Sequence, residues 1–302
     1  RNFAFLFLFF SLTAIGVRLE ERIEETAHWE VMKVSARLEE LQEAKSTSTS
    51  IIETLLPRHV VEMVSSGVSP IAEYFDGVTV MFTDIKGFTA MSAKMQPQEV
   101  IDLLNTMYSM FDEIVINWQV YKVEVIGDAY FLSAGCPARP EVADQPDMWA
   151  MRAVEVALAM QRALSRVADE DRLTMRVGLH TGPVVAGVVG KKGPRYHLFG
   201  STVGYAEKME SSGVPGRVQI SNATHTLLKD GGHDYEFEET HVSLDGGSLP
   251  HTTWLVKRSR SKVALMVQKE LIMQRRVSNN PRQQQQPFSP QASIATPRTT
   301  KS

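Results

Sequence analysis

The first seventeen residues are almost entirely apolar. Residues 3–17 contain only Ser11 and Thr13 as polar positions, and the run stops at Arg18. This is shorter than the ~20 residues that cross a bilayer, yet an apolar run that stops at a basic residue is typical of the cytosolic end of a transmembrane helix. A signal peptide and a buried core helix are the alternatives, although no small-residue cleavage site follows. We expect residues 1–17 to be the end of a transmembrane helix.

The next segment changes to Glu, Arg and Leu with a coiled-coil spacing. Its apolar positions, separated by 3, 4 and 3 residues, are Val31, Val34, Leu38 and Leu41. The repeat is short, so an ordinary amphipathic helix is the alternative. Polar residues 46–50 break the pattern and predict an interruption. A second short amphipathic segment, residues 51–64, follows and is itself interrupted by Pro57. We assign residues 18–70 to a coiled-coil or helical signalling linker.

From about residue 74 strand-like and helix-like patterns alternate. The expected strands are residues 78–82, 120–126 and 129–134, with helices from Pro97 to Asn117 and over residues 148–168. A hairpin is expected from residues 173–179 and 184–189 around the turn 180–183. The order β-α-β-β-α-β predicts an α/β (α+β) fold of the ferredoxin-like type. A strand at 196–199, a helix at 203–211 and a final strand pair ending at 254–257 complete a domain over residues 71–260.

The C-terminal segment differs in composition from this domain. A helical pattern follows residue 262 up to Arg276. Residues 279–302 are rich in Pro, Gln, Ser and Thr and have almost no large apolar side chain, so they cannot form a core. We treat residues 261–302 as a C-terminal helix and a disordered tail.

Composition excludes several functional classes. The 302 residues are 43% hydrophobic, which is enough for a sizeable core. With 32 Lys and Arg against 35 Asp and Glu, the chain carries no concentrated basic surface, so we do not expect a nucleic-acid partner. The single Cys136 cannot form an internal disulfide, and no cluster has the spacing of zinc ligands.

Two aspartates follow the strands that this topology places side by side. In a ferredoxin-like sheet the first strand is antiparallel to the third, so Asp84 at the end of one lies near Asp128 at the start of the other. Each alone could be an ordinary turn residue. As a pair they would repel unless a cation bridges them, and oxygen ligands suit Mg²⁺ or Mn²⁺. The turn after Asp84 opens a helix whose N–H groups can hold phosphate oxygens; it consists of Ile85, Lys86, Gly87, Phe88 and Thr89.

Four sequence blocks resemble those of class III nucleotidyl cyclases, particularly guanylyl cyclases. They are FTDIKGFT, YKVEVIGDAYF, GLHTGPVVAGVVG and PRYHLFGSTV, within a match from about Leu55 to Lys229. The resemblance implies a head-to-tail dimer with two composite sites that convert GTP to cyclic GMP and pyrophosphate. Asp84 and Asp128 match the metal aspartates, which would hold two Mg²⁺ (or Mn²⁺) ions together with Ile85.

The resemblance also implies how the base is read. Glu124 matches the residue with which guanylyl cyclases accept hydrogen bonds from guanine N1 and N2, where adenylyl cyclases usually have Lys. His197 stands where guanylyl cyclases have Cys and adenylyl cyclases have Asp. An imidazole N–H can still donate to guanine O6.

Three family positions on the opposing half-site are altered. The family pattern TVNTASRME reads TVGYAEKME here, so the catalytic Asn is replaced by Gly204 and the catalytic Arg by Lys208. The triphosphate-binding Lys of a KGKG-like turn is missing from LDGGS, which contains Asp245 and Gly247. We therefore expect an asymmetric heterodimer in which a complete partner supplies the missing groups. A silent regulatory pseudocyclase and a weak homodimeric nucleotidyl cyclase remain the alternatives.

The layout is similar to that of fungal rhodopsin-fused guanylyl cyclases. The apolar segment leads directly into a short helix and then the cyclase blocks, which leaves no room between them for a kinase-like domain. We expect a light-sensing membrane domain before residue 1, a cytoplasmic catalytic domain, and signal transfer through the helix at residues 18–45.

Overall fold

The computed structural model describes residues 2–53, 55–138, 145–165, 173–190, 194–243, 250–261 and 264–269. The chain divides into two compact units, residues 1–71 with 188–196 and residues 72–187 with 197–302.

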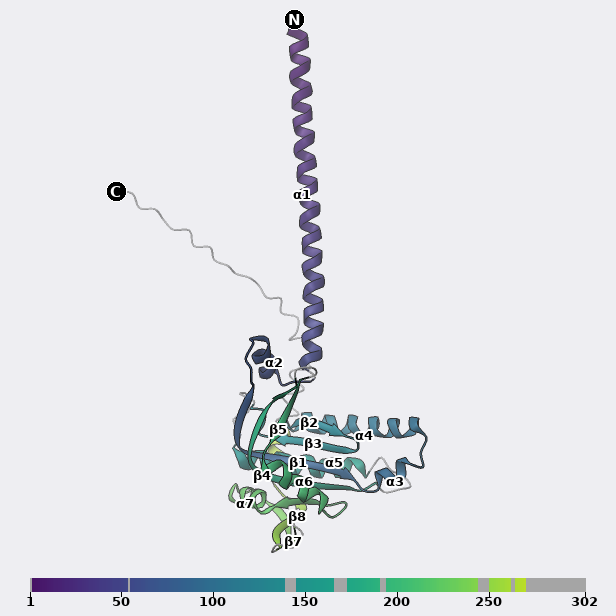
Figure 1. Cartoon of the computed structure of the whole chain (residues 1–302), viewed down its shortest axis with the longest axis vertical. Helices are drawn as coiled ribbons and strands as arrows, with labels where there is room; N and C mark the ends of the chain where they lie inside the picture. The colour runs from purple at the N-terminus through teal and green to yellow at the C-terminus, as the bar shows by residue number, and fades with distance from the viewer. Residues whose placement is uncertain are drawn as a thin grey trace, which may run out of the picture. The chain divides into compact units, whose positions relative to one another are not determined.

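Two helices begin the first unit (Figure 1). Helix α1 runs from Asn2 to Glu53, and α2 from Arg58 to Ser65 directly after Pro57. The predicted interruption at residues 46–50 is therefore wrong. Ser46 shows how a polar residue is accommodated, because its hydroxyl donates to the carbonyl of Glu43 at 2.8 Å, one turn earlier in the same helix.

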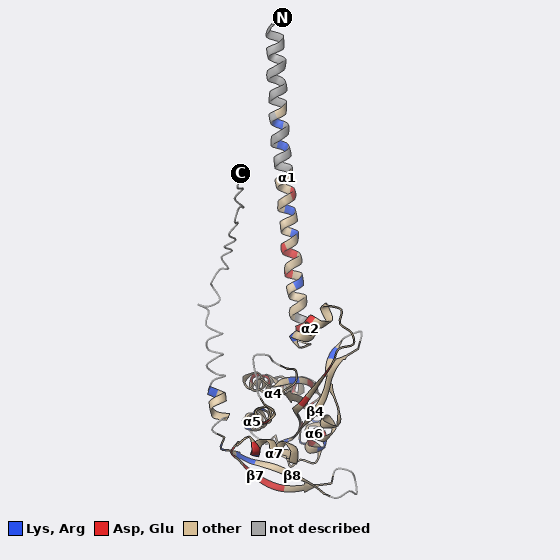
Figure 2. Ribbon diagram, turned by 90° about the vertical axis from the view of Figure 1, so that its left-hand side faces the viewer, with Lys and Arg blue, Asp and Glu red and all other residues tan. Residues whose placement is uncertain are grey.

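The predicted coiled-coil positions of α1 are exposed in the single chain. More than half of the residue surface is accessible at each of Val31, Val34, Leu38 and Leu41. Acidic and basic residues are interspersed along the same helix (Figure 2). Pairing of two such helices stays a prediction. Within the described ranges no helix is both long and apolar enough to cross a membrane.

An eight-stranded, mostly antiparallel sheet forms the centre of the second unit. Its strands are β1 (Ala72–Ile85), β2 (Tyr121–Ile126), β3 (Ala129–Ala134), β4 (Met175–Val189), β5 (Arg195–Phe199), β6 (Val218–Ser221), β7 (Tyr235–Val242) and β8 (His251–Ser259). The order is β2-β3-β1-β4-β6-β8-β7, and β5 pairs with β4. Strand β1 is antiparallel to both β3 and β4, as the predicted β-α-β-β-α-β order requires.

Between residues 88 and 230, five helices accompany the sheet in the described part of the chain. They are α3 (Phe88–Ser92), α4 (Pro97–Asn117), α5 (Pro146–Leu164), α6 (Ser201–Ser211) and α7 (Asn222–Asp230). The bounds of α4 confirm the prediction, and its start is fixed by Pro97 and by a capping box between Gln96 and Glu99. Strand β6 and helix α7 were not predicted. Residues 264–269 are helical, and the rest of the predicted C-terminal helix and tail lies outside the described residues.

The predicted hairpin around residues 180–183 is wrong, because β4 continues through them. His180, Thr181 and Gly182 pair in sequence with residues of β1. Gly182 marks a close contact instead of a turn, since a Cβ there would lie 2.7 Å from the hydroxyl of Thr202 on α6.

The two faces of the sheet carry different helices (Figure 2). Met81 and Ile85 of β1 join the core with residues of α4 and α5 such as Met107 and Met151. Side chains alternate along a strand, so Phe82 and its partner Gly178 face the other side. Helix α6 lies there, and a Cβ on Gly178 would come within 1.9 Å of the backbone nitrogen of Glu210. Glycine at position 178 therefore allows α6 to contact the strand directly.

Candidate active site

The structure brings Asp84 and Asp128 together at one end of β1. Asp84 lies next to the last residue of β1, and Asp128 lies in the turn between β2 and β3. The backbone N–H of Ile85 donates to Oδ2 of Asp128 at 3.3 Å. The pairing of β1 with β3 positions these residues, as the sequence pattern suggested.

The hairpin turn that carries Asp128 is held from α4. Gly127 adopts a φ of 63°, which favours glycine, and the hydroxyl of Tyr108 donates to its carbonyl. The ring of Tyr108 packs against Tyr130 with centroids 5.3 Å apart. Burial raises the pKa of Asp128, and the negative charge of Asp84 raises it further. A cation between the two carboxylates would relieve this cost.

Arg176 is a site residue that sequence reasoning missed. It faces Asp84 across β1 and β4, and its Nη2 lies 2.5 Å from Oδ2 of Asp84. Its Nε lies 3.0 Å from Oε1 of Glu210, and its Nη1 donates to the carbonyl of Ser211 at 3.2 Å. Its position two residues before Gly178 in the GLHTG block is the only sequence signal that pointed to it.

Glu210 is the second site residue that sequence reasoning missed. It is largely buried at the C-terminal end of α6. Burial raises the pKa of Glu210 to about 7, and the positive charge of Arg176 opposes that rise. A guanidinium thus lies between two carboxylates from different elements.

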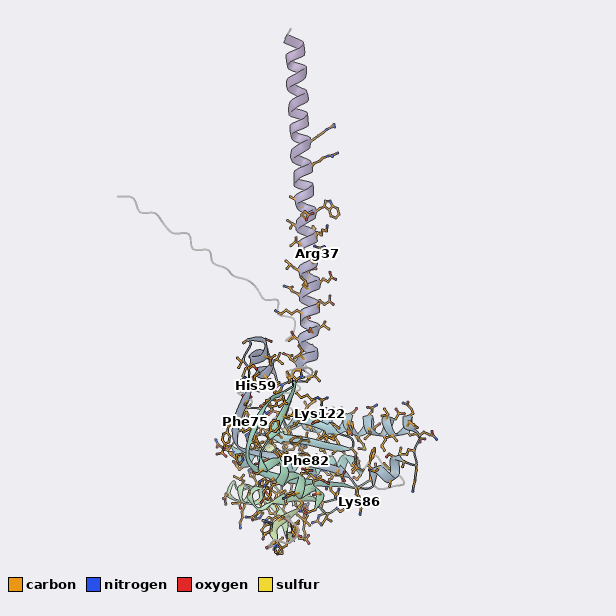
Figure 3. The ribbon with its side chains drawn as sticks, viewed as in Figure 1. Arg37, His59, Phe75, Phe82, Lys86 and Lys122 are labelled. Carbon is orange, nitrogen blue, oxygen red and sulfur yellow. The ribbon has the colours of Figure 1, made fainter. Side chains whose placement is uncertain are left out.

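The predicted phosphate-binding turn is partly exposed and partly engaged in contacts within the chain. Gly87 has a φ of 78° and caps the short helix α3, which begins at Phe88. Lys86 and Thr89 are exposed, whereas Phe88 is buried. The N–H of Lys86 donates to the carbonyl of Thr174 at 2.9 Å, so this N–H is engaged within the chain. Figure 3 shows Phe82 within the sheet and Lys86 in the turn beyond it.

Glu124 and His197 lie close together, although β2 and β5 are not paired. Oε2 of Glu124 is 4.0 Å from Nδ1 of His197. Glu124 pairs with Phe131 and Phe131 with Phe82, so Glu124 faces the same side of the sheet as Asp84. The rings of Phe82 and Phe131 stack on each other, with their centroids 4.5 Å apart.

Two of the three altered family positions, Gly204 and Lys208, lie on α6. Gly204 has open space around its Cα, because a Cβ would meet no heavy atom within 4 Å. Nζ of Lys208 lies 5.8 Å from the ring centroid of Tyr205 on the same helix. Asp245 and Gly247 lie outside the described residues.

The donor set fits a hard divalent cation. Asp84 and Asp128 offer carboxylate oxygens, which suit Mg²⁺ and Mn²⁺. Among the described residues, no group of three or more His, Cys, Asp or Glu gathers as a metal site, so the pair would need oxygens from the backbone or substrate. Arg176 already lies against Asp84, so a metal ion would have to share or replace this contact.

The fold and these residues define an α/β catalytic domain of the nucleotidyl cyclase class. The family "Adenylate and Guanylate cyclase catalytic domain" matches residues 71–258, and the chain belongs to this family.

The similar curated proteins are guanylyl cyclases and receptors. Retinal guanylyl cyclase 2 of Bos taurus is 41% identical over 224 residues, which cover 74% of this chain and 20% of that protein. Atrial natriuretic peptide receptor 2 of Bos taurus is 38% identical over 258 residues, which cover 84% of this chain and 24% of that protein. The chain thus spans about a fifth to a quarter of their length.

Solved structures of fungal cyclase domains share the fold. The guanylate cyclase domain of RhGC from Catenaria anguillulae, in complex with GTP, has a TM-score of 0.56 and 32% identity, and the match covers 62% of this chain and all of that one (100%). A dimeric guanylyl cyclase domain of RhoGC from Blastocladiella emersonii has a TM-score of 0.54 and 31% identity, covering 62% of this chain and 99% of that one.

Proposed function

We propose that this chain is a guanylyl cyclase subunit that contributes the metal-binding half of a heterodimeric site converting GTP to cyclic GMP and pyrophosphate. The observation that carries this proposal is the meeting of Asp84 and Asp128 on the sheet face that also carries Glu124. The similarity to a cyclase domain in complex with GTP supports the choice of substrate.

Asp84 and Asp128 would hold the divalent cations, with Ile85 beside them. The ions would lower the pKa of the substrate 3′-hydroxyl and neutralise charge on the triphosphate. Asp128 is fixed by the hairpin turn and by its hydrogen bond from Ile85. Arg176 supplies a positive charge at the same end of β1. The turn from Lys86 to Thr89 would contact phosphate oxygens.

Glu124 and His197 would distinguish guanine from adenine. A carboxylate accepts hydrogen bonds, so Glu124 suits the N1–H and N2–H donors of guanine. His197, 4.0 Å away, would donate from its ring to guanine O6. Adenine presents the opposite pattern and would leave the carboxylate unmatched.

The heterodimer follows from three missing groups on one half-site. Gly204 has no side chain, Lys208 lacks the planar fork of Arg, and Gly247 replaces a cationic residue. Loss of one transition-state donor lowers turnover by about 10²–10³-fold, so loss of several would nearly silence a site built from two copies. A partner with the complete set would restore one site of the two.

A mixing experiment tests this proposal. The chain is purified alone and together with a complete cyclase subunit whose own two metal aspartates are changed to Ala. Cyclic GMP that forms with Mn²⁺ and GTP only in the mixture supports the proposal. Normal turnover by this chain alone would contradict it.

A regulatory pseudocyclase is the second candidate, and the absence of a side chain at Gly204 is what favours it. In that case the chain would bind a partner without using its own carboxylates. Asp84→Ala separates the two: the substitution abolishes activity of the mixture if Asp84 holds a metal, and leaves the activity unchanged if the chain is only a regulator.

We further propose that α1 connects the catalytic domain to a membrane sensor. The apolar residues 3–17 and the similarity to a domain from a rhodopsin-guanylyl cyclase support this arrangement. Insertion of four residues after Ala44 would rotate the helix phase, whereas insertion of seven would keep a heptad repeat. Activity of the mixture should change with the first insertion and persist with the second; equal effects would contradict the proposal.

A further inference from the structure

The guanidinium of Arg176 is shared between two carboxylates. Nη2 contacts Asp84 at 2.5 Å and Nε contacts Glu210 at 3.0 Å. The proposed function assigns Asp84 to a metal ion, and the inference below rests on that assignment. Arg176 therefore competes with the metal for the same carboxylate.

Glu210 is fixed at its place by the packing of α6. The close approach at Gly178 sets the distance between this end of the helix and β4. The carbonyl of the next residue, Ser211, accepts a hydrogen bond from Nη1 of Arg176 at 3.2 Å. The end of α6 thus offers the guanidinium two contacts away from Asp84.

The contact between Nε of Arg176 and Oε1 of Glu210 is electrostatic. Both atoms are buried, and neither makes a hydrogen bond within the described part of the chain. Only 29% of the Arg176 side chain and 11% of the Glu210 side chain are exposed, so water screens the two charges weakly. Without the charge on Glu210, the guanidinium would be drawn entirely onto Asp84.

We propose that Glu210 is a positioning residue that shares the guanidinium of Arg176 with Asp84 and so allows this carboxylate to exchange Arg176 for the divalent cation. Glu210 touches neither metal nor substrate and acts only through Arg176. When the cation binds Asp84, the guanidinium keeps its contacts with Glu210 and with the carbonyl of Ser211.

A general charge effect predicts a different pattern. Removing a negative charge near the site would favour the anionic nucleotide, so Glu210→Gln would lower the KM for GTP, and it would weaken Mn²⁺ binding whether or not Arg176 is present. The positioning role predicts weaker metal binding only where Arg176 is present, because Arg176 then occupies Asp84. The dependence on Arg176 therefore distinguishes the two explanations.

The experiment measures the Mn²⁺ dependence of the mixture with the complete subunit, for Glu210→Gln and for Glu207→Gln. Glu207 is exposed on the same helix and provides a matched control. For Glu210→Gln we expect the Mn²⁺ concentration at half-maximal activity to rise about tenfold, the usual scale for a group that orients a metal ligand. Glu207→Gln should match the wild type. Thermal unfolding without metal checks that the variants fold.

A double-mutant cycle isolates the action through Arg176. In an Arg176→Gln background, Glu210→Gln should change the Mn²⁺ requirement no further. The inference would be overturned if Glu210→Gln left the Mn²⁺ requirement unchanged when Arg176 is present. It would also be overturned if Glu210→Gln raised the Mn²⁺ requirement equally with and without Arg176.

Mn²⁺ binding in the same mixture, followed by electron paramagnetic resonance with a non-cyclisable GTP analogue, separates this inference from the proposed function. If the wild-type mixture forms no cyclic GMP, the proposed function fails. The weaker Mn²⁺ binding of Glu210→Gln would still support the inference, and equal binding would overturn it.

Discussion

His180 on β4 contacts both β6 and α6 and makes this packing sensitive to solution pH. Its Nδ1 lies 2.7 Å from the hydroxyl of Ser221, and its ring packs against Tyr205 of α6 with centroids 5.0 Å apart. Burial lowers the pKa of His180 below 6.5. The folded protein therefore holds this imidazole neutral at pH 7.

The pH dependence of stability follows from this shift. Below pH 6.5 the unfolded chain binds a proton at His180 that the folded chain does not, so folding stability is lost as the pH falls toward the folded pKa. Thermal unfolding between pH 7.5 and pH 5.5 should show a smaller loss for His180→Gln than for the wild type. His225, whose pKa burial also lowers, is present in both proteins, so parallel curves would contradict this prediction.

At the level of residues, the sequence predicted the groups that lie at strand ends and missed those that depend on packing. Asp84 and Asp128 follow from strand order alone. Arg176 joins them only through the register of β4 against β1, and Glu210 only through the position of α6. Neither the register nor the helix position can be deduced from hydrophobic periodicity.

At the level of elements, α6 depends on the glycines of β4. Gly178→Ala would place a Cβ within 1.9 Å of the α6 backbone. Because the contacted atoms belong to the backbone, no change of side-chain rotamer can relieve the clash. We expect a loss of about 3 kcal/mol in the free energy of unfolding. The outcome is measured by denaturant or thermal unfolding.

Gly204→Ala is the matched control for this prediction. Gly204 lies within α6, and a Cβ at this position would meet no heavy atom within 4 Å, so alanine should stabilise the helix by about 0.5–1 kcal/mol. Equal changes in the free energy of unfolding for Gly178→Ala and Gly204→Ala would show that α6 does not pack directly against β4 at Gly178.

Helix α4 and strand β4 show which elements the sequence could predict. Helix α4 has a Pro at its start and regular apolar spacing, and both ends match the prediction. In β4 the pattern His-Thr-Gly-Pro resembled a turn, but Gly182 is required by the contact with Thr202. Local sequence cannot distinguish a glycine in a turn from a glycine in a strand against which a helix packs closely.

At the level of the whole molecule, the proposed site keeps the residues of its metal half and carries the altered family positions in its other half. The carboxylate pair and Arg176 lie together at the end of β1. The changes at Gly204 and Lys208 lie on α6, where the family carries its transition-state groups in the opposing half-site. In the proposed function this distribution favours two different chains, because a composite site would need one intact half from each of them.

Restoring the family residues should allow this chain to act with a second copy of itself. The open space at Gly204 accepts an asparagine, and Lys208→Arg returns the planar fork. We expect Gly204→Asn with Lys208→Arg to raise cyclic GMP formation by the chain alone about a hundredfold, since each transition-state donor contributes on this scale. Full activity would also need a cation in place of Gly247. Adding Asp84→Ala to this variant should abolish the gain. A restored variant that stays silent would show that the deficit of the single chain lies elsewhere than in these two positions.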